Sequence, residues 1–235
     1  MAAVILEAQG LARAFGGLRA VDGVDFALQA GEIHALIGPN GAGKTTFVSL
    51  LSGRIGPDAG VIRLAGQDIT RLPAHLRVRR GIAYTFQITS IFPRLTVFDN
   101  VALAVQSHGE KGLVPQTRAA LARVGLAGLE EQEAQTLSYG HQRLLELAMG
   151  LALKPRMLIL DEPTQGLAAS EIEGFKALVQ SLVPETTVLL IEHNMDVVMD
   201  IATRITVLNF GQVLATGTPE AIRADPAVQE AYLGA

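Results

Sequence analysis

The stretch with the strongest structural signal is Gly38-Pro39-Asn40-Gly41-Ala42-Gly43-Lys44-Thr45-Thr46. It fits the pattern G-x-x-x-x-G-K-[ST], in which a glycine-rich turn joins a buried strand to a helix. The apolar run Ile33–Ile37 before it predicts that strand, and the residues from about Lys44 to Leu51 predict the helix. A strand, a glycine-rich turn and a helix in this order indicate an α/β fold with a phosphate-binding loop.

The residue types of this stretch suit a polyphosphate. Glycines let the backbone curl so that N–H groups from Gly41 to Thr45 point at phosphate oxygens, and the helix N-terminus adds partial positive charge. Lys44 would reach the β- and γ-phosphates, and the Thr45 hydroxyl would ligate Mg²⁺. We therefore expect an ATP site that includes Gly38, Asn40, Gly41, Ala42, Gly43, Lys44, Thr45 and Thr46. The alternative is a glycine-rich turn with an incidental lysine, and such a chance match occurs in on the order of one in a hundred chains of this length.

A second apolar run, Met157–Leu160, ends in two carboxylates, Asp161 and Glu162. Asp161 at the strand end is expected to hold Mg²⁺. Glu162, one residue further on, is expected to polarise the water that attacks the γ-phosphate. The alternative is that both residues only begin a turn before Pro163. The phosphate-binding stretch favours the functional interpretation, because nucleotide hydrolysis needs a metal ligand and a base.

A third apolar run, Val188–Ile191, is followed by Glu192 and His193. All three predicted strands therefore have polar residues just beyond their carboxyl ends, which is where open α/β sheets place their ligand sites. Short strand-like runs alternate with helical patterns along the chain, so we predict an α/β fold with a mixed, largely parallel sheet.

Composition narrows the class of protein. The chain has 235 residues, 49% of them hydrophobic, with a mean hydropathy of +0.32, but its apolar runs are strand-sized and far below the about 20 residues of a spanning helix. The N-terminus has neither a basic region nor a long apolar core, so no signal peptide is expected and a cytoplasmic location is the default. The absence of Cys excludes thiol chemistry. A net charge of −4 argues against nucleic acid as a partner, and the basic cluster Arg77, Arg79 and Arg80 is interpreted as a solvated or subunit-facing helix end.

The middle of the chain, about 88–149, differs in pattern from its flanks. Helical segments such as 117–124 and 141–151 predominate there, so we predict a helical insertion between core segments 1–87 and 150–235. Towards the C-terminus, alternation around Asn209-Phe210-Gly211 predicts a hairpin. Thr218 and Pro219 then predict the N-cap and first residue of a last helix.

Between the two nucleotide motifs lies Leu137-Ser138-Tyr139-Gly140-His141-Gln142-Arg143, which resembles the LSGGQ signature. With this motif the whole chain resembles the nucleotide-binding subunit of ABC transporters. The resemblance implies one P-loop NTPase domain over residues 1–235, and that Ser138 and Gly140 bind the γ-phosphate of ATP held by a second protomer. A Ser hydroxyl and a Gly N–H at a helix start suit an anion, and Ser138 would also cap that helix. Tyr139 and His141 depart from the signature.

Three further positions follow from the same resemblance. Gln87 matches the glutamine that contacts Mg²⁺ or water, and His193 matches the histidine that contacts the γ-phosphate. Phe15 lies where the family places an aromatic ring that stacks on adenine. By contrast, the stretch Gln165-Gly166-Leu167-Ala168 lacks the Asp that the family often has at its last position.

The branch of the family is indicated by weaker signals. The stretch 15–21, the Tyr-containing signature and the ending Ala231-Tyr232-Leu233-Gly234 resemble importers of branched-chain amino acids and of related solutes such as amides or urea. Residues 90–100 also resemble the ATPase of the lipopolysaccharide exporter, which is the alternative. A non-transport ABC ATPase acting on ribosomes or DNA is less favoured, because the chain has one ATPase unit, no long heptads and an acidic balance. A small-molecule kinase would lack the signature and would need an acceptor pocket.

The resemblance also implies partners. ATP and Mg²⁺ are the expected ligands, and transmembrane permease subunits and a second ATPase protomer, identical or paralogous, are the expected partners. A solute-binding protein would be an indirect partner, and the chain would sit on the inner face of the cell membrane. The permease is expected to dock near Gln87 to Asn100, because Ile88, Ile91, Phe92, Pro93, Leu95 and Val97 are too many apolar residues for a short helix to bury.

Overall fold

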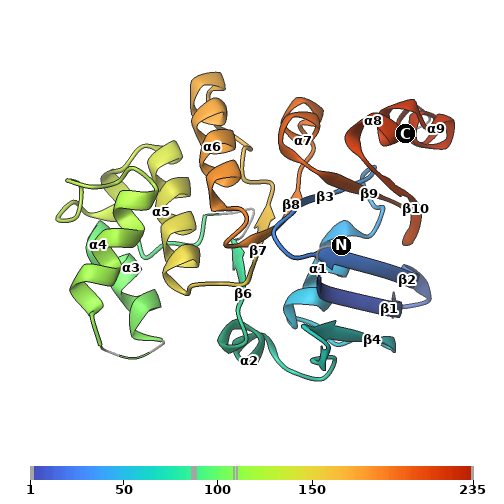
Figure 1. Cartoon of the computed structure of the whole chain (residues 1–235), viewed down its shortest axis with the longest axis horizontal. Helices are drawn as coiled ribbons and strands as arrows, with labels where there is room; N and C mark the ends of the chain where they lie inside the picture. The colour runs from blue at the N-terminus through green and yellow to red at the C-terminus, as the bar shows by residue number, and fades with distance from the viewer. Residues whose placement is uncertain (1–2, 86–88, 108, 110, 234–235) are drawn as a thin grey trace.

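The strands that precede the predicted nucleotide motifs lie in one central sheet (Figure 1). The computed structural model describes residues 3–85, 89–107, 109 and 111–233. The strand order is β10 (Gln212–Gly217), β9 (Arg204–Asn209), β3 (Ile33–Ile37), β8 (Thr187–Ile191), β7 (Met157–Asp161) and β6 (Ile82–Thr85). All neighbouring strands are parallel except the hairpin of β9 and β10. The predicted mixed, largely parallel sheet and the predicted hairpin are confirmed.

The register of this sheet brings three strand ends together. Leu36 near the end of β3 pairs with Ile191 of β8, and Asp161 of β7 pairs with the same Ile191 from the other side. Every residue of β3, β7 and β8 is buried, because helices or the second sheet cover both faces. Along β7, for example, Leu158 belongs to the hydrophobic cluster of Leu147 and Phe175, whereas Ile159 belongs to the cluster of Phe47 and Leu50.

A second sheet, with the order β2 (Leu18–Gln29), β1 (Val4–Phe15), β4 (Ala59–Leu64) and β5 (Gln67–Asp68), is antiparallel. No motif of the sequence predicts it as a separate sheet. It packs with helix α1 (Lys44–Ser52), and the rings of Phe26 and Phe47 meet edge to face with centroids 5.4 Å apart. This packing fixes the position of α1, whose N-terminus carries the glycine-rich loop.

Helix α2 (Ala74–Arg79) holds the basic cluster, and one member of it is not on the surface. Arg77 is fully buried, and its guanidinium donates to the carbonyls of Leu50, Leu51, Thr70 and Leu72. Arg77 thus caps the C-terminal end of α1, where backbone carbonyls lack helical partners. Burial lowers the pKa of Arg77 to about 10. The interpretation of Arg77 as a solvated or subunit-facing residue is therefore wrong, whereas Arg79 and Arg80 are exposed.

Helices α3 (Val97–Gln106), α4 (Leu113–Arg123) and α5 (Tyr139–Ala152) lie together at one end of the molecule, with a 3-10 turn at Ala134–Thr136 between the last two (Figure 1). Helices were predicted at 117–124 and 141–151, and both are confirmed with longer bounds. Val97, which the sequence placed among surplus apolar residues, is buried in the core of this region. That part of the docking argument is wrong.

Further helices follow in the C-terminal part of the chain and pack around the central sheet. They are α6 (Ala169–Leu182), α7 (Met195–Ile201), α8 (Pro219–Ala224) and α9 (Pro226–Leu233). Thr218 caps α8 by accepting a hydrogen bond from the Ala221 N–H, with Pro219 as the first helical residue, as predicted. Among the residues that the structure describes, no helix is long and apolar enough to cross a membrane.

Candidate nucleotide site

The glycine-rich loop connects the buried end of β3 to the start of α1, and two of its glycines are required by close packing. Gly38 has φ +151° and a Cβ there would lie 2.1 Å from the Leu208 carbonyl oxygen. Gly43 has φ +97° and a Cβ would lie 2.2 Å from the Ala20 carbonyl oxygen. A side chain at either position would therefore push the loop away from β9 or β2.

Lys44 begins α1 and folds back over the loop. Its ammonium donates to the carbonyl oxygens of Gly38 at 2.6 Å and Pro39 at 3.0 Å. Burial lowers the pKa of Lys44, while the neighbouring carboxylates of Glu162 and Asp161 act in the opposite direction. The side chain is thus held inside the loop, and opposite charges from two other strand ends lie close enough to influence it.

A cavity of about 670 Å³ opens beside this loop. Ten of the predicted site residues line it: Phe15, Asn40, Gly41, Ala42, Gly43, Lys44, Thr45, Thr46, Glu162 and His193. Gly38 and Asp161 are not part of its lining but adjoin it through Lys44 and Glu162. Five lining residues were not predicted: Leu18, Arg19, Ala20, Ile191 and Phe210. Ile191 is the last residue of the strand β8, which the sequence predicts. The other four residues line the cavity only because the β1–β2 and β9–β10 hairpins pack beside the phosphate loop, and no local pattern predicts that packing.

The two residues expected to act on the γ-phosphate are in direct contact. His193 Nε2 lies 2.6 Å from Glu162 Oε1. Glu162 has φ +48°, an unfavourable conformation for a non-glycine residue, and its N–H donates to the Ile191 carbonyl oxygen at 2.8 Å. Backbone pairing with the end of β8 therefore helps to hold the carboxylate against the histidine of the neighbouring loop.

Asp161 occupies the end of β7 beside Tyr84 of β6. The Tyr84 hydroxyl donates a hydrogen bond to Asp161 Oδ2. Burial is the largest influence on this carboxyl and raises its pKa, with the hydrogen bond from Tyr84 opposing it. Burial likewise raises the pKa of Tyr84, so this hydroxyl stays protonated and donating at neutral pH.

The donor set around Asp161 fits Mg²⁺. Thr45 offers a hydroxyl and Asp161 a carboxylate, and hard oxygen ligands of this kind suit a magnesium ion that keeps most of its shell as water and phosphate oxygens. Within the described ranges 3–85, 89–107, 109 and 111–233, no group of three or more His, Cys, Asp or Glu could hold a metal. Magnesium bound together with a nucleotide needs no such group. Gln87, the third expected metal ligand, lies outside the described residues.

Glu192 is a site residue that sequence reasoning missed. It is buried, and its Oε1 accepts hydrogen bonds from the N–H, at 3.0 Å, and the hydroxyl of Thr164. Its Oε2 accepts from the N–H groups of His193 at 2.8 Å and Asn194 at 3.0 Å. The carboxylate therefore ties the loop that carries Glu162 to the loop that carries His193. The only sequence feature that pointed to this role of Glu192 is its place directly after the apolar strand Val188–Ile191 and before His193.

We expect Glu192→Gln to lower kcat for ATP hydrolysis by about tenfold while KM for ATP stays nearly unchanged. An amide cannot accept from all four donors, and a lost hydrogen bond to a buried charged group is worth about 1.5–3 kcal/mol. The two loops would then hold Glu162 and His193 less well, although the phosphate loop is untouched. Steady-state kinetics checks this, with the exposed Glu185→Gln as control. An unchanged kcat would show that Glu192 does not position the pair.

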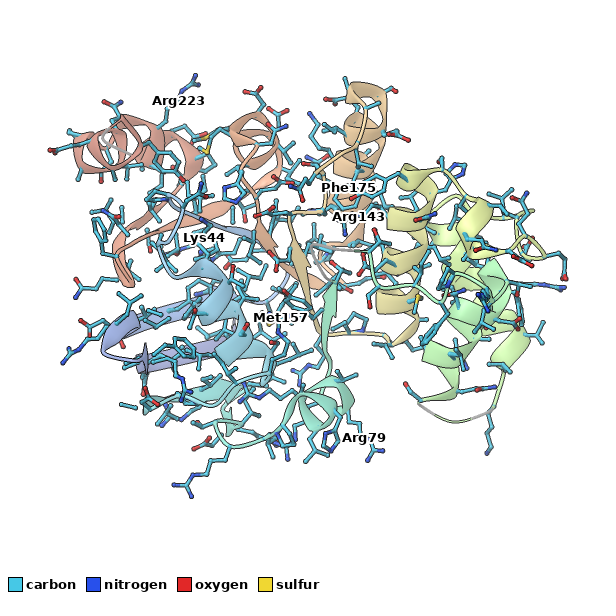
Figure 2. All side chains as sticks on the ribbon, turned by 180° about the vertical axis from the view of Figure 1, so that it is seen from behind. Lys44, Arg79, Arg143, Met157, Phe175 and Arg223 are labelled. Carbon is cyan, nitrogen blue, oxygen red and sulfur yellow. The ribbon has the colours of Figure 1, made fainter. Side chains whose placement is uncertain are left out.

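The signature residues lie elsewhere in the chain. Ser138 caps α5 by accepting from the His141 N–H at 3.3 Å, as predicted, and neither Ser138 nor Gly140 lines the cavity beside the phosphate loop. Figure 2 shows Lys44 at the start of α1 and Arg143, about one turn along α5 from Gly140, between the central sheet and the helices; Arg143 donates to the Glu162 carbonyl oxygen at 3.4 Å. Neither Ser138 nor Gly140 therefore contributes to the nucleotide cavity of its own chain.

Tyr139, a departure from the signature, packs against segment 165–168, which lacks the family's Asp. The ring of Tyr139, in the signature, lies beside Gly166, where a Cβ would be 2.9 Å from Tyr139 Cε1. Nearby, a Cβ on Gly140 would lie 2.2 Å from Glu171 Oε1, and Glu171 Oε2 accepts from the Ala168 N–H at 2.8 Å. The signature is thus joined to the segment 165–168, and the bulk of Tyr139 is accommodated by the absence of a side chain at Gly166.

A glycine-rich loop of this geometry, between a parallel strand and a helix N-terminus, is the nucleotide-binding element of P-loop NTPases. The comparisons define the family within that class. The family model described as "ABC transporter" matches residues 21–165. A second model, "Branched-chain amino acid ATP-binding cassette transporter", matches residues 212–235. The chain belongs to the ABC transporter family of ATP-binding proteins, and it is an ATPase.

Relatives match over the full length. The high-affinity branched-chain amino acid transport ATP-binding protein BraF of Pseudomonas aeruginosa is 41% identical, over 100% of this chain and 99% of the relative. The corresponding protein LivG of Escherichia coli is also 41% identical, with the same coverage. The lipopolysaccharide export system ATP-binding protein LptB of Haemophilus influenzae is 36% identical, over 98% and 97% of the two chains.

Solved structures show the same architecture. The crystal structure of a nucleotide-free ATP-binding cassette from an ABC transporter has a TM-score of 0.90 at 28% identity, covering 99% of this chain and 100% of that one. The ADP conformation of an ATP-binding cassette has a TM-score of 0.89 at 28% identity, covering 99% and 100%. The predicted ABC ATPase fold is confirmed.

Proposed function

We propose that this chain energises import of branched-chain amino acids, or similar small polar solutes, by hydrolysing ATP with the Glu162–His193 pair beside the phosphate loop. The observation that carries the chemistry is the 2.6 Å contact between these two side chains at the rim of the cavity that Lys44 lines. The solute class is supported by the full-length likeness to BraF and LivG and by the model that matches the C-terminal residues.

Each side chain of the site has a separate task in this proposal. Glu162 accepts the proton of the water that attacks the γ-phosphate, and His193 orients that carboxylate and contacts the phosphate. Lys44 exchanges its carbonyl partners for β- and γ-phosphate oxygens, and Phe15 stacks on adenine. Mg²⁺, when bound by Thr45 and Asp161, would supply positive charge against the phosphates.

The second half of each site comes from a second protomer. Ser138 and Gly140 sit at the start of α5, where a helix N-terminus favours an anion, yet neither lines the cavity beside the phosphate loop of its own chain. Two protomers, identical or paralogous, would enclose two ATP molecules, each between one phosphate loop and one signature. The chain would then comprise one nucleotide-binding domain with a core of 1–87 and 150–235 and a helical subdomain of about 88–149.

The permease subunit would dock on the segment that precedes α3. Phe92 is 51% exposed and Leu95 is also exposed, whereas Ile91 packs partly against the core. Asn100 of α3 holds this segment, since its side chain accepts from the Phe92 N–H at 2.7 Å and donates to the carbonyls of Phe92 and Thr96. An exposed apolar pair on an anchored loop suits a protein interface.

We expect Phe92→Glu to reduce co-purification with the permease, and solute uptake, by at least about tenfold, because a buried aromatic anchor typically dominates an interface. Basal ATP hydrolysis by the isolated chain should be unchanged. Val114→Glu, on the exposed face of α4, is the matched control and should leave uptake intact. Loss of folded protein with Phe92→Glu, or full uptake, would contradict this docking surface.

The solute is tested by purifying the chain from its native membrane with its permease and any solute-binding protein. Reconstituted in proteoliposomes, the complex is expected to take up labelled leucine in an ATP-dependent way that Glu162→Gln abolishes. The second candidate, an ATPase of a lipopolysaccharide-type exporter, is favoured by the 36% identity to LptB. Co-purification of lipopolysaccharide transport components without leucine uptake would establish it instead. In either assembly this chain would lie in the cytoplasm, against the inner face of the membrane.

A further inference from the structure

The turn between β9 and β10 consists of Phe210 and Gly211. Asn209 pairs with Gln212 across it, so the hairpin loop has two residues, and both have positive φ, +46° at Phe210 and +78° at Gly211. Two positive φ angles in a two-residue hairpin loop define a type I′ turn. Asn, Asp and Gly are the residues that suit its first central position.

Phenylalanine is an unfavourable residue type at position 210 of this turn. A bulky L-residue is strained at positive φ, and burial of its ring would be the usual compensation. However, Phe210 is 85% exposed. Neither turn preference nor core packing therefore accounts for a phenylalanine there, whereas Asn would serve the hairpin better. A residue that weakens the local fold without packing into it is a candidate for contact with a ligand.

The turn is firmly anchored beside the nucleotide cavity. The Gly211 N–H donates to the Ala42 carbonyl oxygen of the phosphate loop at 3.0 Å, and the Asp22 N–H donates to the Gly211 carbonyl oxygen at 2.9 Å. A Cβ on Gly211 would lie 2.9 Å from the Ala20 carbonyl oxygen, so the turn lies directly on β2. These contacts join β10, β2 and the phosphate loop, and they fix the backbone from which the Phe210 ring projects.

Phe210 shares the cavity with two other exposed apolar side chains. Phe15 is 46% and Leu18 is 72% exposed, and both come from the hairpin between β1 and β2. The rest of the lining is mostly polar or backbone, with the phosphate loop, Glu162 and His193. The cavity therefore combines a phosphate-binding set with three large, exposed apolar side chains, which matches the two chemically different parts of a nucleotide.

We propose that Phe210 is a nucleobase-binding residue, whose ring covers the base that Phe15 also contacts. This inference rests on the nucleotide site of the proposed function and adds a second aromatic residue, besides Phe15, that contacts the base. The ligand class is a nucleoside polyphosphate, because the cavity combines a phosphate-binding loop with aromatic rings, and stacking on such rings uses the flat face of a base. The strain of the turn is retained because the ring acts on the ligand.

The test measures binding of ADP with Mg²⁺ by titration calorimetry, since ADP is not hydrolysed. Phe210→Asn is expected to raise the Kd of ADP at least about fivefold, as loss of a base-stacking ring does elsewhere. The Kd of inorganic pyrophosphate should stay the same, because pyrophosphate has no base. The same variant should raise Tm by about 2–4 °C, since Asn suits the type I′ turn. Phe210→Trp should keep ADP affinity.

Two controls separate the possible causes. Lys154 also has positive φ, +48°, in the exposed turn between α5 and β7, at the opposite end of β7 from Asp161, so Lys154→Asn should raise Tm similarly and leave ADP binding unchanged. Phe15→Ala tests the nucleotide site itself. If Phe15→Ala weakens ADP binding but Phe210→Asn does not, the role of Phe210 is overturned and the site stands. If neither variant changes ADP binding, the base site as a whole is wrong.

Two further outcomes would overturn the inference. Equal weakening of ADP and pyrophosphate would mean that Phe210 acts through the phosphate loop, to which Gly211 is hydrogen-bonded. A lower Tm for Phe210→Asn would mean that the ring stabilises the hairpin. An affinity loss confined to ADP, together with a higher Tm, supports the inference, because a purely structural role would move both quantities in the same direction.

Discussion

Glu162→Gln is expected to reduce ATP turnover by about 10²–10⁴-fold, the range typical for loss of a general base. The amide has the size of the carboxylate and can still contact His193, but it cannot accept the proton of the attacking water. It also removes a negative charge near the γ-phosphate, so ATP binding should hold or tighten. Bound ATP would then persist, and a closed dimer should accumulate.

The measurement combines a turnover assay with size-exclusion chromatography in ATP and Mg²⁺. Glu173→Gln, an exposed substitution on α6, is the matched control and should leave both readouts at the wild-type level. Turnover near wild type for Glu162→Gln would exclude Glu162 as the base. If hydrolysis stops without a dimer, the base assignment stands, and the explanation lies in the signature, in segment 165–168 or in a missing paralogous partner.

Lys44→Ala is expected to weaken ATP binding by about 10–100-fold. The ammonium would make charge-assisted hydrogen bonds to phosphate, and such a bond to a charged group is worth about 1.5–3 kcal/mol. At an ATP concentration of one hundred times the wild-type Kd, ATP stabilises the wild-type fold by about 2.7 kcal/mol. For Lys44→Ala, whose Kd is expected to be about 10–100-fold higher, this stabilisation should fall to about 0.4–1.4 kcal/mol. No ATP-dependent dimer should form.

The free protein should nevertheless keep its stability. Burial lowers the pKa of Lys44 below that of the unfolded chain, so at neutral pH the charged ammonium is disfavoured by folding rather than stabilised by it. This cost is fully present below the lowered pKa of the folded state, and it disappears as the pH rises from that pKa to the unfolded value near 10.5. Lys44→Ala removes this cost together with two hydrogen bonds to the carbonyls of Gly38 and Pro39, and because these effects oppose each other we expect little change in the stability of the nucleotide-free fold. Thermal melts with and without ATP test this, with the exposed substitution Glu185→Gln as control, and a melt lowered in both conditions would contradict it.

Local patterns were sufficient to predict the elements that carry the site. The strand before Gly38, the strand that ends at Asp161 and the strand before Glu192 are short apolar runs that end in polar residues, and the structure confirms each of them. The caps of Ser138 and Thr218 are likewise confirmed, because a side chain hydrogen-bonded three residues along the chain is a local interaction. The assignments of Ser138, Gly140 and Gln87 stay predictions, and Gln87 lies outside the described residues.

Residues whose environment depends on distant segments could not be predicted in this way. From the sequence, Arg77 is expected at the surface or at a subunit contact. In the structure it is buried against the C-terminal end of α1, where it donates to the carbonyl oxygens of Leu50 and Leu51, and also to those of Thr70 and Leu72. Val97 looked like part of an apolar surface, yet α3 turns it into the core. In both cases the residue type is compatible with a surface or a buried position, and the packing of distant segments determined that it is buried.

By itself, then, the sequence determined the chemistry available and the order of the elements: a phosphate loop, an Asp-Glu strand end and a histidine after a third strand. Tertiary structure decided that Glu162 touches His193, because the register of β7 and β8 and the hydrogen bonds of Glu192 bring their two loops together. The close approach of β10, β2 and the phosphate loop placed Phe210 in the nucleotide cavity. The physical reason is that side-chain type and periodicity are encoded locally, whereas contacts between residues far apart in the chain arise only when the sheets and helices pack.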